Sequence, residues 1–375
     1  MKRRALLVGR TRYPWPVPQD KFDALRGALD IRVLGTSADG TAHSDATFTL
    51  VPRLPVLDGL LFWLLLPARI SRLVREFRPD AIVCQTAYEG AAALVARGIA
   101  RVPARVVVEV HGDWRTATRL YGSPARRALS RVADAVAAAA IRRADRVRTV
   151  SPFTASLVRE LGVEPAADFP AYMDLESFTR PPVPLPERPV ALFVGVLEAY
   201  KNIDGLATAW RKSDVDADLR IVGKGSREPV VRELVAGSGG GKAATARPED
   251  RAARGGPGGV RWDRELSHEQ VADALDEAWI LVLPSRSEGM GRVLVEAFLR
   301  GRGVVGSRAG SIPNLVEDGV SGLLVDSTDE LADALARVLS DRELAERLGH
   351  AARAAATPWL QTPEEYAERM RELVA

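Results

Sequence analysis

The sequence predicts an α/β protein that contains two parallel, doubly wound sheets, each in its own domain. Short apolar runs alternate with amphipathic helical patterns along the chain, and this alternation is typical of parallel sheets. The alternation stops at Arg180–Pro189, where five of ten residues are proline, and then restarts. A length of 375 residues also suits two domains better than one.

The first half of the chain supplies five strand candidates rich in β-branched and aliphatic residues. Amphipathic helical patterns separate them. The strands are expected at Ala5–Val8, Ile31–Leu34, Ala81–Cys84, Val106–Val110 and Arg146–Val150, and the helices at Asp20–Leu29, Leu60–Phe77, Gly90–Ala100 and Ser123–Arg143. Ligands of such sheets bind beyond the carboxyl ends of the strands, so we expect functional residues there.

The second half repeats the alternation after the prolines. Its strands are expected at Val190–Val194, Leu219–Val222, Ile280–Leu283, Gly303–Gly306 and Gly322–Val325. We therefore assign residues 1–180 to a first domain, 181–189 to a stiff linker outside either core, and 190–357 to a second domain. The stretch from Gly237 to Gly259 is rich in glycine and poor in large apolar residues, so we expect a surface insertion without a ligand.

Charge is distributed unevenly between the halves. The first 180 residues contain 27 Lys and Arg against 18 Asp and Glu, and the remainder contains 25 against 31. Arg69, Arg72, Arg75 and Arg78 have helical spacing and would form one basic face. That face is either solvated or in contact with an anionic membrane surface or a lipid-diphosphate acceptor. Nucleic acid is not expected as a partner, because the basic clusters lack interleaved aromatic residues.

The most hydrophobic segment, Leu54–Ile70, is interrupted by Asp58, Gly59 and Pro67. It is too short to span a bilayer and fits either a buried helix or a helix on a membrane surface. The apolar run at the N-terminus is too short for a signal peptide and reads as the first strand.

Cysteine and histidine usage limits the chemistry that we expect. The single cysteine, Cys84, lies in an apolar run and excludes a disulfide framework, which favours a reducing compartment. The four histidines show no metal-ligand spacing, so no metal site is expected. These features predict a cytoplasmic protein, or one bound peripherally at the inner face of a membrane.

The most informative motif lies in residues 284–297, after the apolar strand candidate Ile280–Leu283. A proline and a glycine-bearing turn precede a helix that starts near Arg292. Unpaired backbone N–H groups and the positive helix end make such a turn an anion site. Glu288 and Glu296 bracket it, so a diphosphate between a ribose and a second sugar would suit the motif. The alternative is that Glu288 caps the helix and Glu296 is a solvated helix residue.

This run resembles the signature of two glutamates eight residues apart in retaining glycosyltransferases, most closely glycosyltransferase family 4. The resemblance implies a GT-B fold, in which two Rossmann-like domains face each other across a cleft, with residues 358–375 forming a terminal helix that packs back on the first domain. It also implies a nucleoside-diphosphate-sugar donor, metal independence and no bound cofactor. The donor-binding residues that it implies are Gly9, Gly195, Lys201, Gly223, Ser285, Glu288, Gly289, Met290, Gly291, Arg292, Val293 and Glu296.

Lys201 follows the strand Val190–Val194 and resembles the family's lysine that contacts the donor diphosphate. The alternative is a solvated residue at a helix start, which the positive helix end disfavours. The family often carries an arginine where Val196 stands. Either Arg292 or Arg286 substitutes for it, or donor binding is weaker.

In the first domain, His111 follows a strand and resembles the family's cleft histidine near the transferred sugar; the alternative is a structural histidine bonded to backbone. Asp113 is a weaker candidate for the base that accepts the acceptor's proton. Gly9 stands at the family's flexible donor-side loop. By the resemblance, Glu288, His111 and Lys201 form the catalytic set.

The sequence thus predicts a retaining glycosyltransferase that moves a sugar from a UDP or GDP donor to a glycan or lipid-linked acceptor, in envelope polysaccharide or glycolipid synthesis. Two alternatives remain open. One is a nucleotide-sugar epimerase of the same shape, and the other is a non-catalytic scaffold descended from such enzymes. A dehydrogenase is disfavoured because no G-x-G-x-x-G follows the first strand.

Overall fold

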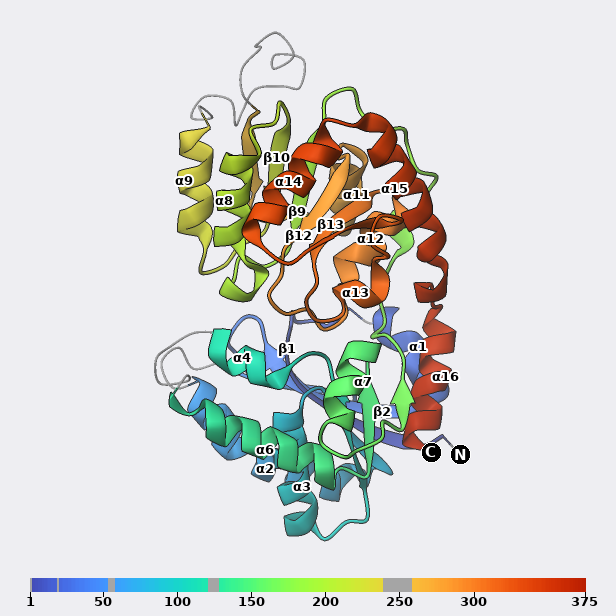
Figure 1. Cartoon of the computed structure of the whole chain (residues 1–375). Coiled ribbons are helices and arrows are strands. Elements are labelled where there is room, and N and C mark those ends of the chain that lie inside the picture. The colour runs from blue at the N-terminus through green and yellow to red at the C-terminus, as the bar shows by residue number, and fades with distance from the viewer. Residues whose placement is uncertain (1, 19, 53–57, 121–127, 239–257) are drawn as a thin grey trace. The chain divides into compact units, whose positions relative to one another are not determined.

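The computed structural model describes residues 2–18, 20–52, 58–120, 128–238 and 258–375. Contacts divide the chain into two compact units (Figure 1). Unit 1 comprises Met1–Tyr172 with Gln361–Ala375, and unit 2 comprises Met173–Leu360. All ten predicted strands are present.

Unit 1 is built on an eight-stranded sheet in the order β3-β4-β2-β1-β5-β6-β7-β8. The strands are β3 (His43–Ser44), β4 (Phe48–Val51), β2 (Asp30–Ser37), β1 (Arg4–Tyr13), β5 (Ala81–Cys84), β6 (Arg105–Val110), β7 (Arg146–Thr149) and β8 (Ala167–Asp168). Only the short β3 pairs antiparallel, with β4; the other pairs are parallel. The chain reverses direction across the sheet between β1 and β5, so the carboxyl ends of these strands form a switch point where ligands bind.

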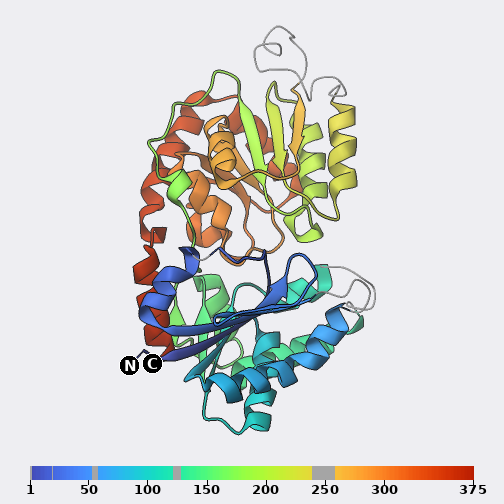
Figure 2. The same cartoon turned by 180° about the vertical axis from the view of Figure 1, so that it is seen from behind.

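Helices cover both faces of this sheet (Figures 1 and 2). They are α1 (Asp20–Ala28), α2 (Asp58–Phe77), α3 (Ala87–Ala100), α4 (Trp114–Leu120), α6 (Ser130–Arg143), α7 (Pro152–Arg159) and α16 (Pro363–Val374). Successive residues of β1 enter different cores: Leu6 and Val8 pack with α2, α3 and α6, and Ala5 packs with α1 and α16. This alternation follows from the two-residue period of a strand and explains its near-continuous apolar sequence.

Unit 2 contains a fully parallel six-stranded sheet in the order β11-β10-β9-β12-β13-β14. The strands are β9 (Val190–Val194), β10 (Asp218–Val222), β11 (Val260–Asp263), β12 (Ile280–Leu283), β13 (Gly303–Ser307) and β14 (Gly322–Val325). The helices are α8 (Ile203–Ser213), α9 (Glu228–Gly237), α11 (His268–Asp276), α12 (Arg292–Leu299), α13 (Ile312–Leu315), α14 (Thr328–Leu339) and α15 (Arg342–Ala355), with 3₁₀ turns η1 (Glu176–Phe178), η2 (Ala199–Lys201) and η3 (Thr357–Trp359). This is the Rossmann strand order, and its switch point lies between β9 and β12.

The proline-rich segment differs from the expected linker. Leu185 is buried in the core of unit 2, and the division between the units falls after Tyr172 instead of after residue 180. The reason is that prolines lack N–H groups but keep their carbonyls, which arginines of unit 2 can bind. Arg300 donates to the carbonyls of Arg180 (2.5 Å) and Pro181 (3.1 Å), and Arg302 donates to that of Val183 (3.1 Å).

One helix prediction also needs correction, and one helix was not predicted. The expected helix Ser123–Arg143 appears as α6, which starts at Ser130, and residues 121–127 lie outside the described residues. Sequence analysis missed α4, although Asp113 provides its first-turn hydrogen bonds. Most of the glycine-rich stretch, residues 239–257, also lies outside the described residues.

Helix α2 carries residues 58–70 of the most hydrophobic segment and is buried along one side, as the buried-helix interpretation expects; residues 54–57 lie outside the described residues. Phe62, Leu66 and Ile70 are buried, whereas Leu64 is 64% and Leu65 is 45% exposed. Within the described residues, no helix is both long and apolar enough to cross a membrane.

Candidate functional site

Lys201 and Glu288 meet at the switch point of unit 2. Lys201 ends η2, which follows β9, and Glu288 lies in the loop after β12, 87 residues later. The Nζ atom of Lys201 donates to Oε2 of Glu288 at 2.5 Å, and both side chains are largely buried. Lys201 is therefore not a solvated residue at a helix start. The pair places a cation and a carboxylate beside each other at the sheet edge where parallel sheets bind ligands.

Two glycines shape the loop that carries Glu288. Gly310 has φ +60°, and a Cβ there would lie 2.2 Å from the carbonyl oxygen of Glu288. Gly291 has φ +68° and stands directly before α12, where a Cβ would lie 2.7 Å from Leu294. Only glycine fits both positions, so the backbone of the loop can lie close to a ligand at the start of α12.

Glu296 lies on α12 and is buried. Its Oε1 accepts a hydrogen bond from Nε of Arg292 at 2.6 Å. Arg292 also donates to the carbonyl of Asp174 at 3.0 Å and lies 3.2 Å from Nε2 of His268. Glu296 is thus not a solvated helix residue, and Arg292 holds it in place.

The remaining predicted donor residues are distributed over neighbouring loops. Gly195 follows β9 and Gly223 follows β10; a Cβ on Gly223 would lie 1.9 Å from the carbonyl oxygen of Gly195, so glycine allows the two loops to touch. Met290 and Val293 pack against the core of unit 2. Gly289 lies between Glu288 and Met290 in the same loop.

Ser285 is fully buried, and its Oγ has no hydrogen-bond partner in the described part of the chain. It lines a cavity of about 430 Å³ at the carboxyl ends of β12, β13 and β14, together with Asn202 and Arg286. Arg286 donates to Oδ1 of Asn202 at 2.9 Å. The two arginines expected to compensate for Val196 therefore bind other partners, Arg286 to Asn202 and Arg292 to Glu296.

In unit 1, Gly9 and His111 line one cavity of about 510 Å³ at the carboxyl ends of β1, β5 and β6. The prediction of a flexible loop at Gly9 is wrong, because β1 continues to Tyr13 through a register shift between Val8 and Arg12. A Cβ on Gly9 would lie 2.0 Å from Oε1 of Gln85, so the Gln85 side chain packs directly against Gly9.

His111 belongs to a network that sequence reasoning missed. Its Nε2 lies 3.3 Å from Oε2 of Glu109, and Oε1 of Glu109 accepts from the fully buried Arg148. Arg148 also donates to the carbonyl of Pro170 at 2.7 Å and stacks over the Phe169 ring at 3.9 Å. The sequence signal that could have revealed the network is one charged residue, Glu109 or Arg148, inside each of two strands that pair as neighbours.

The network fixes the charge state of Glu109. Burial alone would raise its pKa, but the charge of Arg148 and the hydrogen bond with His111 outweigh burial and lower the pKa to about 2. Tyr366 of α16 lies beside Arg148, and burial raises the pKa of Tyr366 to about 12. An ionised Glu109 therefore faces His111 and orients its ring.

Asp113 has a structural role. Its Oδ1 accepts from the backbone N–H of Arg115 and from Nε of Arg115, both at 3.0 Å, and its Oδ2 accepts from Thr116 at 2.8 Å. These bonds cap the start of α4. Across the ranges that the structure describes, no three His, Cys, Asp or Glu side chains gather as a metal site.

Two family models match adjoining parts of the chain. Residues 19–167 match the glycosyl transferase 4-like domain, and residues 177–355 match glycosyl transferases group 1. An α-D-kanosaminyltransferase of Streptomyces kanamyceticus is 30% identical over 169 residues, which are 44% of this chain and 40% of that protein. A GDP-mannose-dependent α-(1-6)-phosphatidylinositol monomannoside mannosyltransferase of Mycobacterium tuberculosis is 29% identical over 76% of this chain and 73% of its own length.

Solved structures agree on the fold. Sucrose-phosphate synthase of Thermosynechococcus elongatus superposes with a TM-score of 0.77 at 20% identity, covering 99% of this chain and 98% of that one. HepE of Anabaena, in complex with UDP-glucose, superposes with a TM-score of 0.68 at 18% identity, over 98% and 99% of the two chains. The first curated relatives are matched over only about two fifths of their length, 40% and 43%. The two family matches, the shared fold and the paired α/β units together identify this chain as a member of the family 4-like glycosyltransferases with the GT-B fold.

Proposed function

We propose that this chain is a retaining glycosyltransferase that takes a sugar from a nucleoside-diphosphate donor. The observation that carries the proposal is the Lys201–Glu288 pair at the switch point of unit 2. A donor needs a cation at its diphosphate and a hydrogen-bond acceptor at its sugar hydroxyls, and this pair supplies both within 2.5 Å. The name of the M. tuberculosis relative supports a GDP-sugar, and the complex of the Anabaena structure supports a UDP-sugar, as donor candidates.

Each residue has a proposed role in binding the donor. Lys201 and the backbone amides at the start of α12 hold the diphosphate and stabilise the charge that develops on the leaving phosphate. Glu288 binds hydroxyls of the transferred sugar. Glu296 binds the ribose hydroxyls through Oε2, because Oε1 is occupied by Arg292. Gly195 and Gly223 let the backbone approach the ligand.

The proposed reaction is displacement on one face of the sugar. The acceptor oxygen forms a bond to the anomeric carbon on the face from which the phosphate departs, and the sugar–phosphate bond breaks. The acceptor proton passes to the departing phosphate oxygen. His111, oriented by the buried Glu109, positions the sugar or the acceptor hydroxyl. This route uses no metal and no bound cofactor.

The acceptor is proposed to be a glycan or a lipid-linked molecule used in envelope polysaccharide or glycolipid synthesis at the inner face of a membrane. Helices α2, α3 and α6 support this, since they pack side by side and expose apolar residues in unit 1. The exposed residues of these helices are Leu64, Leu65, Val95, Ile99, Val132 and Val136, and Leu129 is exposed directly before α6. Arg69, Arg72 and Arg75 lie on the same helix α2, which is the combination found in helices that bind anionic membrane surfaces.

The decisive experiment screens UDP-, GDP- and ADP-sugars for thermal stabilisation and turnover by the parent and by K201A and E288A. The parent should be stabilised by one nucleotide class, and both variants should lose at least tenfold in affinity, since each removes a charged contact. K212A is the matched control, because Lys212 is an exposed lysine on α8 that pairs with Asp329. If K201A and E288A bind and turn over the donor like K212A, the site assignment is wrong.

Two readouts test the reaction itself. Nuclear magnetic resonance of the product should show the same anomeric configuration as in the donor; inversion would contradict the retaining mechanism. Release of free nucleoside diphosphate from the donor without any acceptor would instead identify an epimerase-like elimination.

A further inference from the structure

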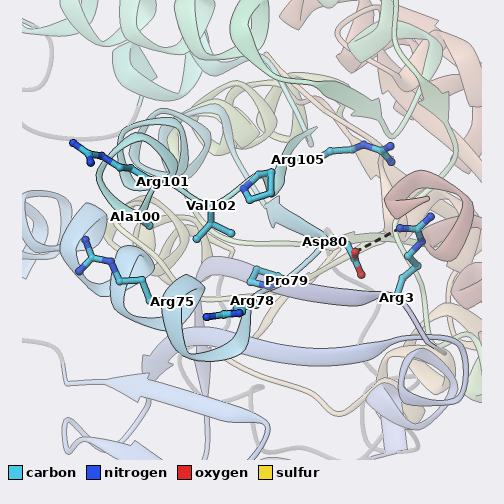
Figure 3. A pocket seen from close by; sticks show the side chains of 10 residues that line it. Arg3, Arg75, Arg78, Pro79, Asp80, Ala100, Arg101, Val102 and Arg105 are labelled. Atoms are coloured by element: carbon cyan, nitrogen blue, oxygen red, sulfur yellow. Dashed lines mark hydrogen bonds and ion pairs between the residues drawn. The ribbon is translucent and has the colours of Figure 1, made fainter.

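A cavity of about 700 Å³ lies at the amino-terminal edge of the sheet of unit 1. It is formed where α2 and α3 end and where β1, β5 and β6 begin, at the sheet edge opposite to Gly9 and His111. The charged residues that line it are Arg3, Arg75, Arg78, Asp80, Arg101 and Arg105 (Figure 3). Five arginines therefore share one cavity with a single carboxylate.

That carboxylate is already engaged. Oδ1 of Asp80 lies 3.5 Å from Arg3, joined by a dashed line in Figure 3, and its Oδ2 accepts from the backbone N–H of Arg4 at 2.8 Å. Arg75 donates to the carbonyl of Ile99 at 3.0 Å, and Arg105 donates to the carbonyl of Val374 at 3.5 Å. Arg105 also donates to the oxygen of Ala375, so Arg105 is engaged at the end of α16. The neutral carbonyl of Ile99 leaves the charge of Arg75 uncompensated.

Arg78 and Arg101 have no side-chain hydrogen bond or ion pair with any residue that the structure describes. Both are exposed, and both follow directly after a helix, α2 and α3 respectively. Their guanidinium groups are therefore available to a ligand in the cavity.

The backbone at these two positions is unfavourable for arginine. Arg78 has φ 49° and Arg101 has φ 53°, the left-handed region that helix ends usually fill with glycine. Within the described residues, the other non-glycine residues with positive φ are Asn202 and Asp214, whose residue types tolerate that region. The backbone N–H of each residue closes its helix, Arg78 to the carbonyl of Val74 and Arg101 to that of Arg97. Glycine would make the same bonds without the strain, so the helix end does not explain the choice of arginine.

Complementing the helix dipoles does not explain these arginines. Arg75 and Arg97 already occupy the last turns of α2 and α3, where a cation suffices for that purpose. Moreover, the carboxyl ends of helices repel anions, so any attraction for an anion at this cavity must come from the arginine side chains.

We propose that this cavity binds a phosphate-bearing ligand through Arg78 and Arg101, with Arg75 contributing charge. Guanidinium groups bind phosphate oxygens in a bidentate manner, and 700 Å³ accommodates a small polyphosphorylated molecule or a phospholipid headgroup. The site is separate from the proposed donor site, which lies in unit 2, and it does not depend on the proposed function.

The test uses R78G/R101G in the full chain. Glycine removes both guanidinium groups and relieves the left-handed backbone, so Tm should stay equal or rise, while a merely structural role would lower it. Inorganic tripolyphosphate should bind the parent saturably by calorimetry, and R78G/R101G should bind at least tenfold more weakly. K201A should keep the binding component that R78G/R101G loses, which separates this cavity from the donor site, where Lys201 is proposed to hold a diphosphate.

R337A/R353A is the matched control for charge, because Arg337 and Arg353 are exposed arginines on α14 and α15. It should bind tripolyphosphate like the parent. If R78G/R101G folds poorly, R78N/R101N serves instead, since asparagine tolerates positive φ.

Co-sedimentation with vesicles of phosphatidylglycerol in phosphatidylcholine distinguishes the two sources of phosphate. Loss of vesicle binding in R78G/R101G, but not in R337A/R353A, assigns the site to a lipid headgroup. A loss confined to tripolyphosphate assigns it to a soluble ligand. The proposal is overturned if the parent binds neither probe, or if R78G/R101G binds both as the parent does.

Discussion

The buried pair Arg148–Glu109 allows a quantitative prediction for unit 1. Arg148 is fully buried, and the Glu109 side chain is 7% exposed, so neither charge is well hydrated. Replacing Arg148 by methionine leaves the Glu109 carboxylate buried without its cation. Removing one partner of a buried ion pair typically destabilises a protein by about 3–5 kcal/mol.

The pKa of Glu109 gives a second estimate of the same interaction. Its ordinary value of 4.5 is lowered to about 2, because the charge of Arg148 and the bond with His111 outweigh the effect of burial. A depression of this size corresponds to roughly 3 kcal/mol of folding free energy. Because the folded pKa is lowered, this stability is present above pH 4.5 and is lost as the pH falls towards 2. R148M should abolish most of that acid dependence.

Urea unfolding at pH 7 and at pH 3 measures both effects, and hydrogen exchange of peptides from β6 and β7 assigns them to unit 1. The control is E109L/R148M, which removes both charges and should recover most of the loss. A residual cost of about 1–2 kcal/mol is expected, since the carbonyls of Phe169 and Pro170 lose their donor. The reasoning fails if R148M lies within 1 kcal/mol of the parent, or if the double variant is as unstable as the single one.

Three further predictions concern unit 2. Leu185→Ala should destabilise unit 2 by about 2–5 kcal/mol in urea unfolding, because Leu185 is buried in the core of that unit. V183A changes an exposed residue of the same segment and should alter stability little. Equal effects of the two substitutions would mean that the proline-rich segment is a free linker. Gly223→Ala should lower Tm and weaken donor binding, because the new Cβ would lie 1.9 Å from the carbonyl oxygen of Gly195. The control G237A adds a Cβ in open space and should change neither Tm nor donor binding. If G223A behaves like G237A, the geometry described for Gly223 is contradicted. Glu296→Ala should weaken binding of the natural donor by about 1.5–3 kcal/mol, measured by calorimetry. A donor that lacks the 2′ and 3′ hydroxyls should bind the parent and the variant equally. An equal loss of affinity for both donors would argue against the ribose contact.

Local sequence predicted the elements because their signals are local. The strands Val190–Val194 and Ile280–Leu283 were found at their observed bounds, since a short aliphatic run closed by a glycine or a proline determines where pairing ends. The misses, such as the two-residue β3 and the seven-residue α4, are too short to show a period of their own. The linker was misjudged for a different reason: proline content describes the backbone, but Arg300 and Arg302, distant in the chain, decide where that backbone packs.

By itself, the sequence determined the two α/β halves, the family, and the pairing of a glycine turn with Glu288 and Glu296. Periodicity and motif spacing depend on residues that are close together in the sequence, so they can be recognised without a structure. Only the tertiary structure decided which charges meet: Lys201 with Glu288, Arg292 with Glu296, Arg148 with Glu109, and the arginines gathered at the amino-terminal edge of the first sheet. The physical reason is that strand order brings together segments that are far apart in the chain, 87 residues for Lys201 and Glu288. The energy of a charge then depends on its neighbours in space and on its burial.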